Sequence, residues 1–382
     1  MFKVVVGQSD EADTGYAIAA VLHQCQTALA GVIPQAGILL SAIDFDYGLM
    51  LNQIQAVFPG LQLIGGTTDG EVSSQTGFRQ DSVVLMLFIS DTITIQAGYG
   101  PDTSHDPLAA ARQAVAQASR EQTVPTLCLV IAESLGINGL SIVESLCQTL
   151  GDGFPIFGGL TGDQAKFQQT YQFFQDRVMT DSLPVLLFFG PLQFSYGMAH
   201  GWTPIARQGK ITAAGNNAVM AINGKPALDL YDYYLDGLTP SPEYPLAIFA
   251  PDSDTFYLRA PIGCDRDTGS IQFLVDIPPH VDVQIAHATQ TDILIACETA
   301  TRTALERYPG ERPAAALIFS CCTRRYLLGT RTEEEYAISQ QLLPANLPIA
   351  GFYSYGEIAP QAPKTSASLH HETFISLLLG DS

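Results

Sequence analysis

The chain has 382 residues, of which 47% are hydrophobic and 15% are charged, and its formal net charge is −20 at pH 7. At about 150 residues per domain, this length predicts two or three domains with large apolar cores. Surfaces that bind nucleic acid are basic, so the acidic composition argues against a nucleic-acid partner. The seven cysteines are scattered and form no CxxC pair, which argues against a disulfide framework and a zinc cage.

The N-terminal sequence, MFKVVVGQSDEAD, lacks the basic region and long apolar run of a signal peptide. No segment reaches about 18 consecutive apolar residues, so we expect no membrane span. With the scattered cysteines, these features predict a cytoplasmic protein.

An apolar strand that leads into a glycine-containing stretch occurs three times in the chain. The three stretches are 63-LIGGTTDGEV-72, 155-PIFGGLTGDQ-164 and 348-PIAGFYSYGEIAP-360. They align on Gly65, Gly158 and Gly351. Each copy has a hydroxyl residue three positions later, namely Thr68, Thr161 and Ser354. Such self-similarity is typical of a protein built from internal repeats.

The same series of predicted strands and helices surrounds each of the three glycine-containing stretches. The opening strand and helix are 3–10 and 15–29, then 93–100 and 107–119, then 281–288 and 292–308. The second strands are 37–43, 126–132 and 314–321, and the closing strands are 82–90, 184–190 and 373–380. Their continuous Leu, Ile and Val runs are typical of buried strands. The sequence therefore predicts an α/β fold of mixed sheets covered by helices, with three related β-α-β-α-β-β units.

A different region, at about 191–280, is rich in short strands separated by turn residues such as Asn223–Gly224. One helix, at about 226–235, begins with a proline in its first turn, where the missing N–H costs nothing. We place a domain boundary near residue 225, which gives domains 1–225 and 226–382.

Several blocks resemble the FIST sensory domain family over nearly the whole chain. They are LIGGTTDGE at 63–71, FGGLTGD at 157–163, HGWTPI at 200–205, NGKPALDLYDYYL at 223–235, FSCCTRRYLLG at 319–329 and PIAGFYSYGEIAP at 348–360. The two expected domains would be the N-terminal and C-terminal FIST domains. Where the family tends to have a His-Asn-x-Thr-like stretch, this chain has His370-His371-Glu372-Thr373, so the role of that Asn is open.

The resemblance implies a cytoplasmic sensor of small molecules such as amino acids. Because FIST-like sequence fills the chain, the output would be a separate signalling protein such as a kinase or a cyclase. Some members of the family resemble haem-based nitric-oxide sensors. We expect no cofactor and no metal, and a haem held by His200 or His370 is the alternative. Such a haem would be bound non-covalently, because no C-x-x-C-H attachment site is present.

The glycine stretches predict a polar ligand site, because glycine turns at strand ends expose backbone N–H groups beside hydroxyls. They match neither a P-loop nor a dinucleotide fingerprint. The expected ligand-binding residues are Gly66, Thr67, Thr68, Asp69, Glu71, Thr161, Asp163, Cys321, Arg324, Tyr353, Ser354, Tyr355 and Glu357. Alternatively, the glycines only let the chain turn tightly between strands.

Charged residues near these stretches could hold both ends of an amino acid. An Arg fork at Arg324 or Arg325 would bind the carboxylate, and Glu71 or Glu357 would face the ammonium group. Structural salt bridges are the alternative for the acids. Cys321, at the end of a strand, could instead be the nucleophile of an enzyme, although buried cysteines of this kind are usually inert. We expect a ligand-binding sensory protein rather than an enzyme, with its site between the domains.

Overall fold

The computed structural model describes residues 1–119, 124–250 and 255–381. It confirms the predicted α/β class, with mixed sheets covered by helices. No helix within these ranges is long and apolar enough to pass through a lipid bilayer.

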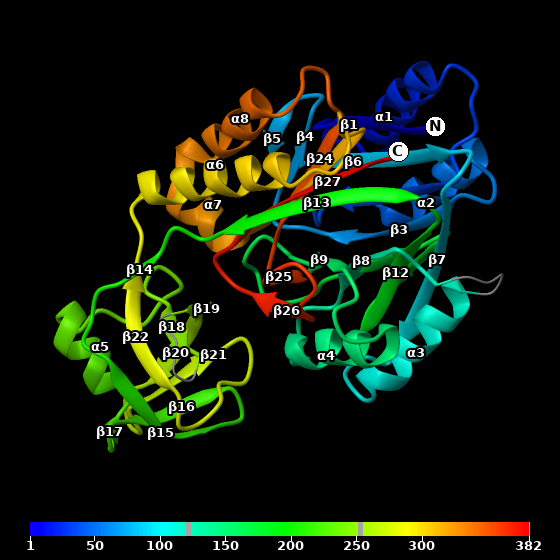
Figure 1. The fold of residues 1–382 in the computed structure, drawn as a ribbon. Coiled ribbons are helices and arrows are strands. Elements are labelled where there is room, and N and C mark those ends of the chain that lie inside the picture. Colours follow the sequence, from blue (N-terminus) through cyan, green and yellow to red (C-terminus); the bar gives the residue numbers. More distant parts are fainter. Residues whose placement is uncertain (120–123, 251–254, 382) are drawn as a thin grey trace.

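Three units with a shared order of elements build the core (Figure 1). The first comprises β1 (Phe2–Ser9), α1 (Thr14–Leu29), β2 (Ala36–Ser41), α2 (Tyr47–Val57), β3 (Gln62–Thr67), β4 (Glu71–Ser73), β5 (Gly77–Arg79) and β6 (Val83–Ser90). The second comprises β7 (Thr94–Pro101), α3 (Pro107–Ala118), β8 (Leu127–Ala132), α4 (Gly139–Leu150), β9 (Ile156–Leu160), β10 (Gln172–Phe174), β11 (Arg177–Met179) and β12 (Ser182–Phe189).

The third unit is interrupted after its first strand. It comprises β13 (Leu192–Ala199), α6 (Gln290–Glu306), β23 (Ala315–Cys321), α7 (Cys322–Leu328), η1 (Gly329–Arg331), α8 (Thr332–Leu342), β24 (Ile349–Ser354), β25 (Glu357–Pro360), β26 (Ala367–His370) and β27 (Phe374–Asp381). The inserted region comprises β14 (Thr203–Pro204), β15 (Gly209–Gly215), β16 (Ala218–Ile222), β17 (Lys225–Pro226), α5 (Leu228–Leu235), β18 (Leu246–Phe249), β19 (Phe256–Arg259), β20 (Pro261–Asp265), β21 (Ser270–Phe273) and β22 (Asp282–His287).

The strand that opens the third unit differs from the prediction. Residues 281–288 were expected there, but β22 pairs with β14, β15 and β18 inside the inserted region. The opening strand is β13, which pairs antiparallel with β27, as β1 pairs with β6. The prediction was wrong because it chose the apolar strand nearest to α6, whereas an insertion separates the true first strand from its helix.

Each core sheet borrows a hairpin from another unit. The shared order is first strand, last strand, second strand, third strand and then the hairpin. Hairpin β10–β11 of the second unit extends the first sheet, β25–β26 of the third unit extends the second sheet, and β4–β5 of the first unit extends the third sheet. The exchange closes a three-membered ring, so no unit completes its own sheet.

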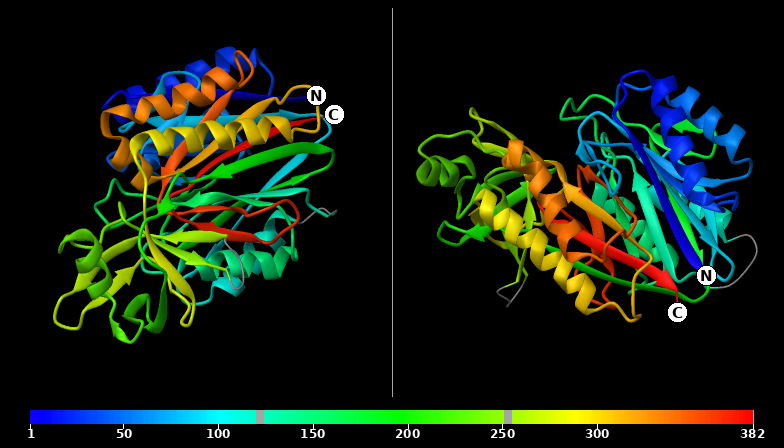
Figure 2. Two further views of the ribbon diagram at one scale, coloured as in Figure 1. Left: turned by 60° about the vertical axis from the view of Figure 1, so that its left-hand side comes forward. Right: turned by 90° about the horizontal axis from the view of Figure 1, so that it is seen from above.

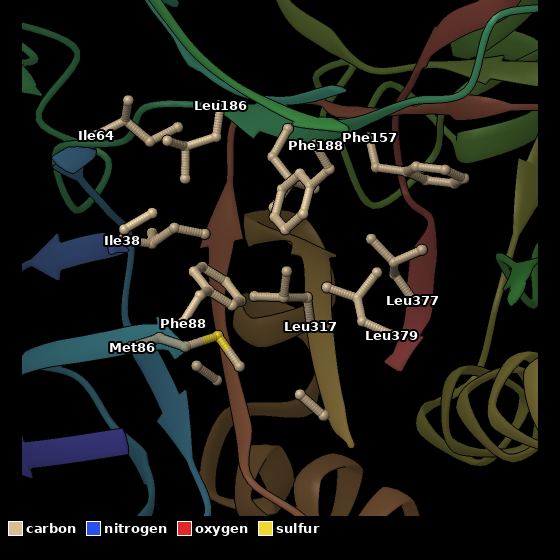
Figure 3. Close-up of a cluster of buried hydrophobic side chains, with 14 of the residues drawn as sticks. Ile38, Ile64, Met86, Phe88, Phe157, Leu186, Phe188, Leu317, Leu377 and Leu379 are labelled. Atoms are coloured by element: carbon tan, nitrogen blue, oxygen red, sulfur yellow. The ribbon is translucent and has the colours of Figure 1, made fainter. Parts of the chain in front are cut away.

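The inner faces of all three sheets meet in one apolar core (Figure 3). Phe88, Phe188 and Leu377 represent the three sheets in this cluster. The outer face of each sheet packs against its own helices, as Leu39 and Leu85 do with Ile18 of α1. Burial on both faces explains why the strands are continuously apolar in the sequence.

The inserted region forms a separate lobe beside the core (Figure 2). It has its own apolar cluster, which includes Tyr231, Ile271 and Ile285. The lobe also contacts the core directly, because Arg259 Nη1 donates to Leu369 O of β26 at 3.2 Å. The predicted strand-rich region is thus confirmed, but it is inserted within the third unit after β13 and does not lie between the second and third units.

Candidate functional site

The aligned glycines lie inside strands β3, β9 and β24 rather than in turns, which corrects the prediction. A Cβ at Gly65, Gly158 or Gly351 would overlap a carbonyl oxygen of the parallel neighbour, namely that of Leu39, Val130 or Ile318. These glycines therefore permit a close approach between strands, one of the standard uses of glycine.

The residue after the aligned glycine, Gly66 or Gly159, lies close to a side chain of the neighbouring unit. A Cβ on Gly66 would lie 2.6 Å from Thr161 Cγ2, and one on Gly159 would lie 3.0 Å from Ser354 Cβ. The third unit has Phe352 at this position. The predicted hydroxyl residues therefore reach across from one unit to the next.

Backbone hydrogen bonds join the units in the same cyclic way. Gly162 N–H donates to Thr67 O at 2.9 Å, and Asp69 N–H donates to Tyr353 O at 2.9 Å. Tyr355 N–H donates to Leu160 O at 3.4 Å and completes the cycle. The glycine stretches thus form the centre of the three-unit ring.

Two buried carboxylates at this centre, Glu71 and Glu357, have matching partners. Glu71 accepts from Thr68 Oγ1, from Ser82 Oγ at 2.7 Å and from Ser82 N at 3.2 Å. Burial raises the pKa of Glu71 to about 8 and that of Glu357 to about 7. Because both side chains are fully buried, they hold the ring together rather than facing an open ligand site.

Glu357 repeats this arrangement in the third unit. It accepts from Ser354 Oγ at 2.8 Å, from Thr373 Oγ1 at 2.7 Å and from Thr373 N at 3.2 Å. The hydroxyl and the acid are three residues apart in both units.

The second unit has Gln172 at the equivalent place, which the sequence analysis missed. Gln172 Oε1 accepts from Ser182 Oγ at 3.1 Å, and its Nε2 donates to Thr161 Oγ1 and Glu133 Oε2, each at 3.2 Å. Thr161 and Gln172 are 11 residues apart, so the alignment on the glycines could not pair them. The sequence does contain a signal for this equivalence, because an acid followed by a hydroxyl residue occurs at the closing strand of each unit. These pairs are Asp81–Ser82, Asp181–Ser182 and Glu372–Thr373.

Asp69, at the edge of the ring, forms a buried ion pair. Arg325 Nη1 donates to Asp69 Oδ2 at 2.6 Å, and Tyr326 Oη donates to Asp69 Oδ1 at 3.0 Å. Burial raises the pKa of Asp69 to about 6, against the opposing effect of Arg325. The pair joins the first unit to α7 of the third.

Asp163 organises the loop 162–171 of the second unit. It accepts from Tyr355 Oη and from the N–H groups of Phe167 at 2.9 Å, Gln168 at 2.7 Å and Gln169 at 3.1 Å. Phe167 stacks on Tyr355 with ring centroids 4.8 Å apart and remains half exposed. The loop thus presents an aromatic side chain on a rigid base.

Arg324 is fully buried and its donors are used within the third unit. It forms an ion pair with Glu335 at 2.7 Å and also donates to His200 O at 2.7 Å and Ile293 O at 2.9 Å. Tyr353 Oη donates to Glu335 Oε2 at 2.7 Å. Arg324 and Tyr353 therefore belong to a buried structural network.

Cys321 lies beside this network and is also buried. Burial raises the pKa of the Cys321 thiol well above its usual range. A protonated, buried thiol is a poor nucleophile, because the thiolate is the reactive form.

A cavity of about 740 Å³, here called the strand-end cavity, lies where β8 ends against the inserted lobe. Its lining residues are Ser134, Leu135, Gly136, Ile137, Asn138, Phe167, Asn216, Asn217, Pro242, Ile262, Leu274, Val275 and Asp276. Ser134 Oγ is buried and has no hydrogen-bond partner among the residues that the structure describes. Ligand sites are common both at the carboxyl ends of strands and between domains.

A second cavity of about 540 Å³, here called the histidine cavity, lies on another side of the same lobe. Its lining residues are Met198, Ala199, His200, Gly201, Phe256, Tyr257, Leu258, Asp292, Ile295, Ala296, Thr299, Gln361, His370, His371 and Thr373. The structure therefore brings together His200 and His370, the two residues of the haem alternative.

The hydrogen bonds of these histidines fix where each ring carries its proton. His200 Nδ1 accepts the N–H of Trp202 at 3.0 Å, so its proton is on Nε2. His370 Nε2 donates to Ala359 O at 2.9 Å, so its Nδ1 is unprotonated. An axial haem ligand must present an unprotonated nitrogen to iron. His200 does not fit that role in this tautomer, and the two residues together do not fit as a pair of axial ligands.

Two cyanuric acid hydrolases are among the solved structures that resemble this chain. The hydrolase from A. caulinodans has 10% sequence identity and a TM-score of 0.41, with 99% of each chain covered. A second cyanuric acid hydrolase has 10% identity and a TM-score of 0.37, with both chains covered completely.

Among curated proteins, an uncharacterised protein of Mycobacterium tuberculosis (strain ATCC 25618 / H37Rv) is 25% identical over 381 residues. The match covers 94% of this chain and 95% of the relative. An uncharacterised protein of Mycobacterium bovis is 27% identical over 186 residues, which are 44% of this chain and 46% of the relative.

Models of two protein families match most of the chain. The FIST N domain matches residues 35–225, and the FIST C domain matches residues 227–360. The chain therefore belongs to the FIST family.

Proposed function

We propose that the protein is a sensor of a small molecule that binds in the strand-end cavity. FIST domains are associated with small-ligand sensing in signal transduction, which supports this general role. The observation that carries the choice of site is the loop 162–171. In this loop the second unit departs from the symmetry of the core, and the same loop supplies Phe167 to the cavity.

The lining of the strand-end cavity suits a mainly apolar ligand with a few hydrogen-bonding groups. Leu135, Ile137, Phe167, Ile262 and Val275 supply apolar surface. Phe167 and Ile262 remain 50% and 47% exposed, and exposed large apolar side chains at a cavity mouth favour ligand contact.

The polar groups of the cavity connect the core to the inserted lobe. Asn138 Nδ2 donates to Asp276 Oδ2 at 3.0 Å, and Asn217 N–H donates to Asp276 Oδ1 at 2.8 Å. The unpartnered hydroxyl of Ser134 would gain a partner from a ligand, which relieves the cost of a buried unsatisfied group. A ligand here touches both bodies, so its binding energy can shift their relative position.

The signal would pass from the cavity to the ring through Phe167. This side chain stacks on Tyr355, whose hydroxyl donates to Asp163. We propose that the resulting change is read by a separate signalling protein such as a kinase or a cyclase. Binding rather than catalysis is favoured because the Cys321 thiol is buried and its pKa is raised well above the usual range.

The test combines native mass spectrometry with a thermal-shift screen of small metabolites. We expect a mass adduct that disappears on denaturation, or compounds that raise Tm in a concentration-dependent way. Ile262→Trp fills the cavity from the lobe side and should abolish the response. The matched control is Ile205→Trp, because Ile205 is also in the lobe, is 49% exposed and lines neither cavity. A response that survives in Ile262→Trp would contradict the proposed site.

A further inference from the structure

Arg259 is a buried cation without a counter-charge among the described residues. Its side chain, on β19, is 5% exposed and forms no ion pair with any residue that the structure describes. Within the described part of the chain, its Nη1 donates only to the carbonyl oxygens of Leu258 at 3.0 Å and Leu369 at 3.2 Å, and its Nε has no partner. The guanidinium lies 4.4 Å from the centroid of the Tyr257 ring. A buried charge with only neutral partners is costly and indicates a missing anion.

Neighbouring carboxyl groups do not supply that anion. Glu372 is fully buried and makes no ion pair with Arg259, and burial raises its pKa well above the usual range, which favours the neutral acid. Asp292 lines the histidine cavity, but its Oδ2 accepts from Thr289 N at 2.9 Å and from Thr289 Oγ1 at 2.6 Å. The positive charge of Arg259 thus remains uncompensated among the described residues.

Histidines that line the histidine cavity present further N–H donors near Arg259. His371 Nδ1 accepts the N–H of Ala260 at 3.3 Å, so the ring proton is on Nε2, which has no partner in residues 1–119, 124–250 and 255–381. His200 also carries its proton on Nε2. Arg259 is not itself a lining residue of the histidine cavity. It lies directly behind the lining, because its guanidinium packs on Tyr257 and the N–H of the next residue, Ala260, donates to His371.

We propose that the histidine cavity is a second ligand site, which binds a small organic carboxylate with Arg259 as its counter-charge. The carboxylate would accept from the Nε2–H groups of His200 and His371. Phe256, Leu258 and Ile295 supply the apolar wall for the body of the ligand. This site is distinct from the strand-end cavity and does not depend on the function proposed for it.

The test titrates the full-length protein with 4-phenylbutanoate and with its neutral isostere, 4-phenylbutanamide, by isothermal calorimetry. We expect the carboxylate to bind at least about tenfold more tightly than the amide, because only the carboxylate supplies the missing charge. In Arg259→Met, carboxylate affinity should fall at least about tenfold. The Tm of this variant without ligand should be unchanged or higher, because removal of an uncompensated buried charge relieves its desolvation cost.

Three further variants distinguish binding at Arg259 from binding elsewhere on the protein. Arg177→Met removes an exposed arginine that also lies over a tyrosine ring, at 5.7 Å, and should leave binding unchanged. Phe167→Ala alters the lining of the strand-end cavity but touches no residue that lines the histidine cavity, so it should also leave binding unchanged. His200→Phe keeps a ring but loses the N–H donor, so it tests the site even if Arg259→Met does not fold, and it should weaken binding several-fold.

The proposal is overturned if the carboxylate does not bind, if the amide binds as tightly, or if the folded Arg259→Met and His200→Phe variants both keep wild-type affinity. Loss of binding in Phe167→Ala would move the carboxylate to the strand-end cavity and would also overturn it.

Discussion

The second unit of the core differs from the first and third in one place. In the first and third units, the ring hydroxyl and its acid partner are three residues apart, as in Thr68 and Glu71. In the second unit the pair is Thr161 and Gln172, 11 residues apart, and the additional chain forms the loop that carries Phe167. The elements that all units share hold the ring closed, whereas the additional loop of the second unit lines a cavity.

The amide of Gln172 explains a further difference between the units. Gln172 always donates through its Nε2, to Thr161 Oγ1 and Glu133, whereas Glu71 and Glu357 can donate only when they carry a proton. A carboxyl group that carried a proton could make the same pattern as the amide. The raised pKa values of Glu71 and Glu357 are consistent with that equivalence.

The largest expected loss of stability follows from replacing the glycines that all three units share. Gly158→Ala should destabilise the protein by on the order of 3 kcal/mol or more, because the new Cβ would overlap Val130 O of the adjacent strand. Gly65→Ala and Gly351→Ala should behave alike, since their Cβ atoms would overlap Leu39 O and Ile318 O. Urea denaturation provides the measurement. Gly215→Ala is the control, because no heavy atom lies within 4 Å of its Cβ position. A Gly158→Ala variant as stable as the wild type would contradict the conclusion that these glycines are needed for the close approach of the strands.

The second-largest effect is expected when Gln172 of the second unit and Glu71 of the first unit are each replaced by the other's residue type. Gln172→Glu should cost about 2–3 kcal/mol at pH 7, because the new acid must either remain charged against the buried Glu133 or take up a proton to replace the lost donor. The reverse exchange, Glu71→Gln, should stay within about 1 kcal/mol of the wild type, because Gln172 shows that an amide fits this environment. Denaturation curves at pH 7 compare them. If both substitutions lower the free energy of unfolding equally, the surroundings of Gln172 and Glu71 do not differ in their preference for an amide or an acid.

A third effect concerns pH. The folded pKa values of Glu71 and Glu357 are raised from 4.5 to about 8 and about 7, so the native state binds more protons than the unfolded state between these limits. Stability from these groups is therefore present below pH 4.5 and is lost as pH rises through the folded values, by up to about 1.4 kcal/mol per pH unit for each group.

The variant Glu71→Gln with Glu357→Gln should flatten this dependence between pH 5 and 8, as measured by chemical denaturation. The exposed Glu311→Gln is the control and should keep the wild-type slope. A double variant that retains the full slope would assign the proton uptake to other groups, among which Asp69, with its pKa raised to about 6, is the first to examine.

The smallest effect on stability concerns the additional loop. Phe167→Ala should cost less than about 1 kcal/mol, because the side chain is half exposed. Loss of its stacking on Tyr355 should nevertheless increase hydrogen exchange at the amides of 167–169, which donate to Asp163. Val178→Ala, at 39% exposure on β11, is the control. Unchanged exchange in Phe167→Ala would mean that Asp163 alone holds the loop.

The order of elements could be predicted from the sequence, because it depends on local patterns. Continuous apolar runs mark strands buried on both faces, and the G-x-x-[TS] spacing identified Thr68, Thr161 and Ser354 as equivalent. Each of these three residues forms a hydrogen bond with the buried acid or amide of its own unit. The sequence also revealed the family, since its motif blocks are spread over the two matched domains.

The tertiary structure alone decided which strands pair and which side chains are already occupied. The hairpin exchange, the place of β13 after a long insertion and the match of Gln172 with Glu71 all depend on pairing between distant segments, which no local period encodes. Arg324 has the chemistry of a ligand clamp, but Glu335 occupies it, whereas Arg259 drew no attention in the sequence and is left without a counter-charge among the described residues. Residue type fixes what a side chain can bind, but only the packed chain determines whether a partner is already present.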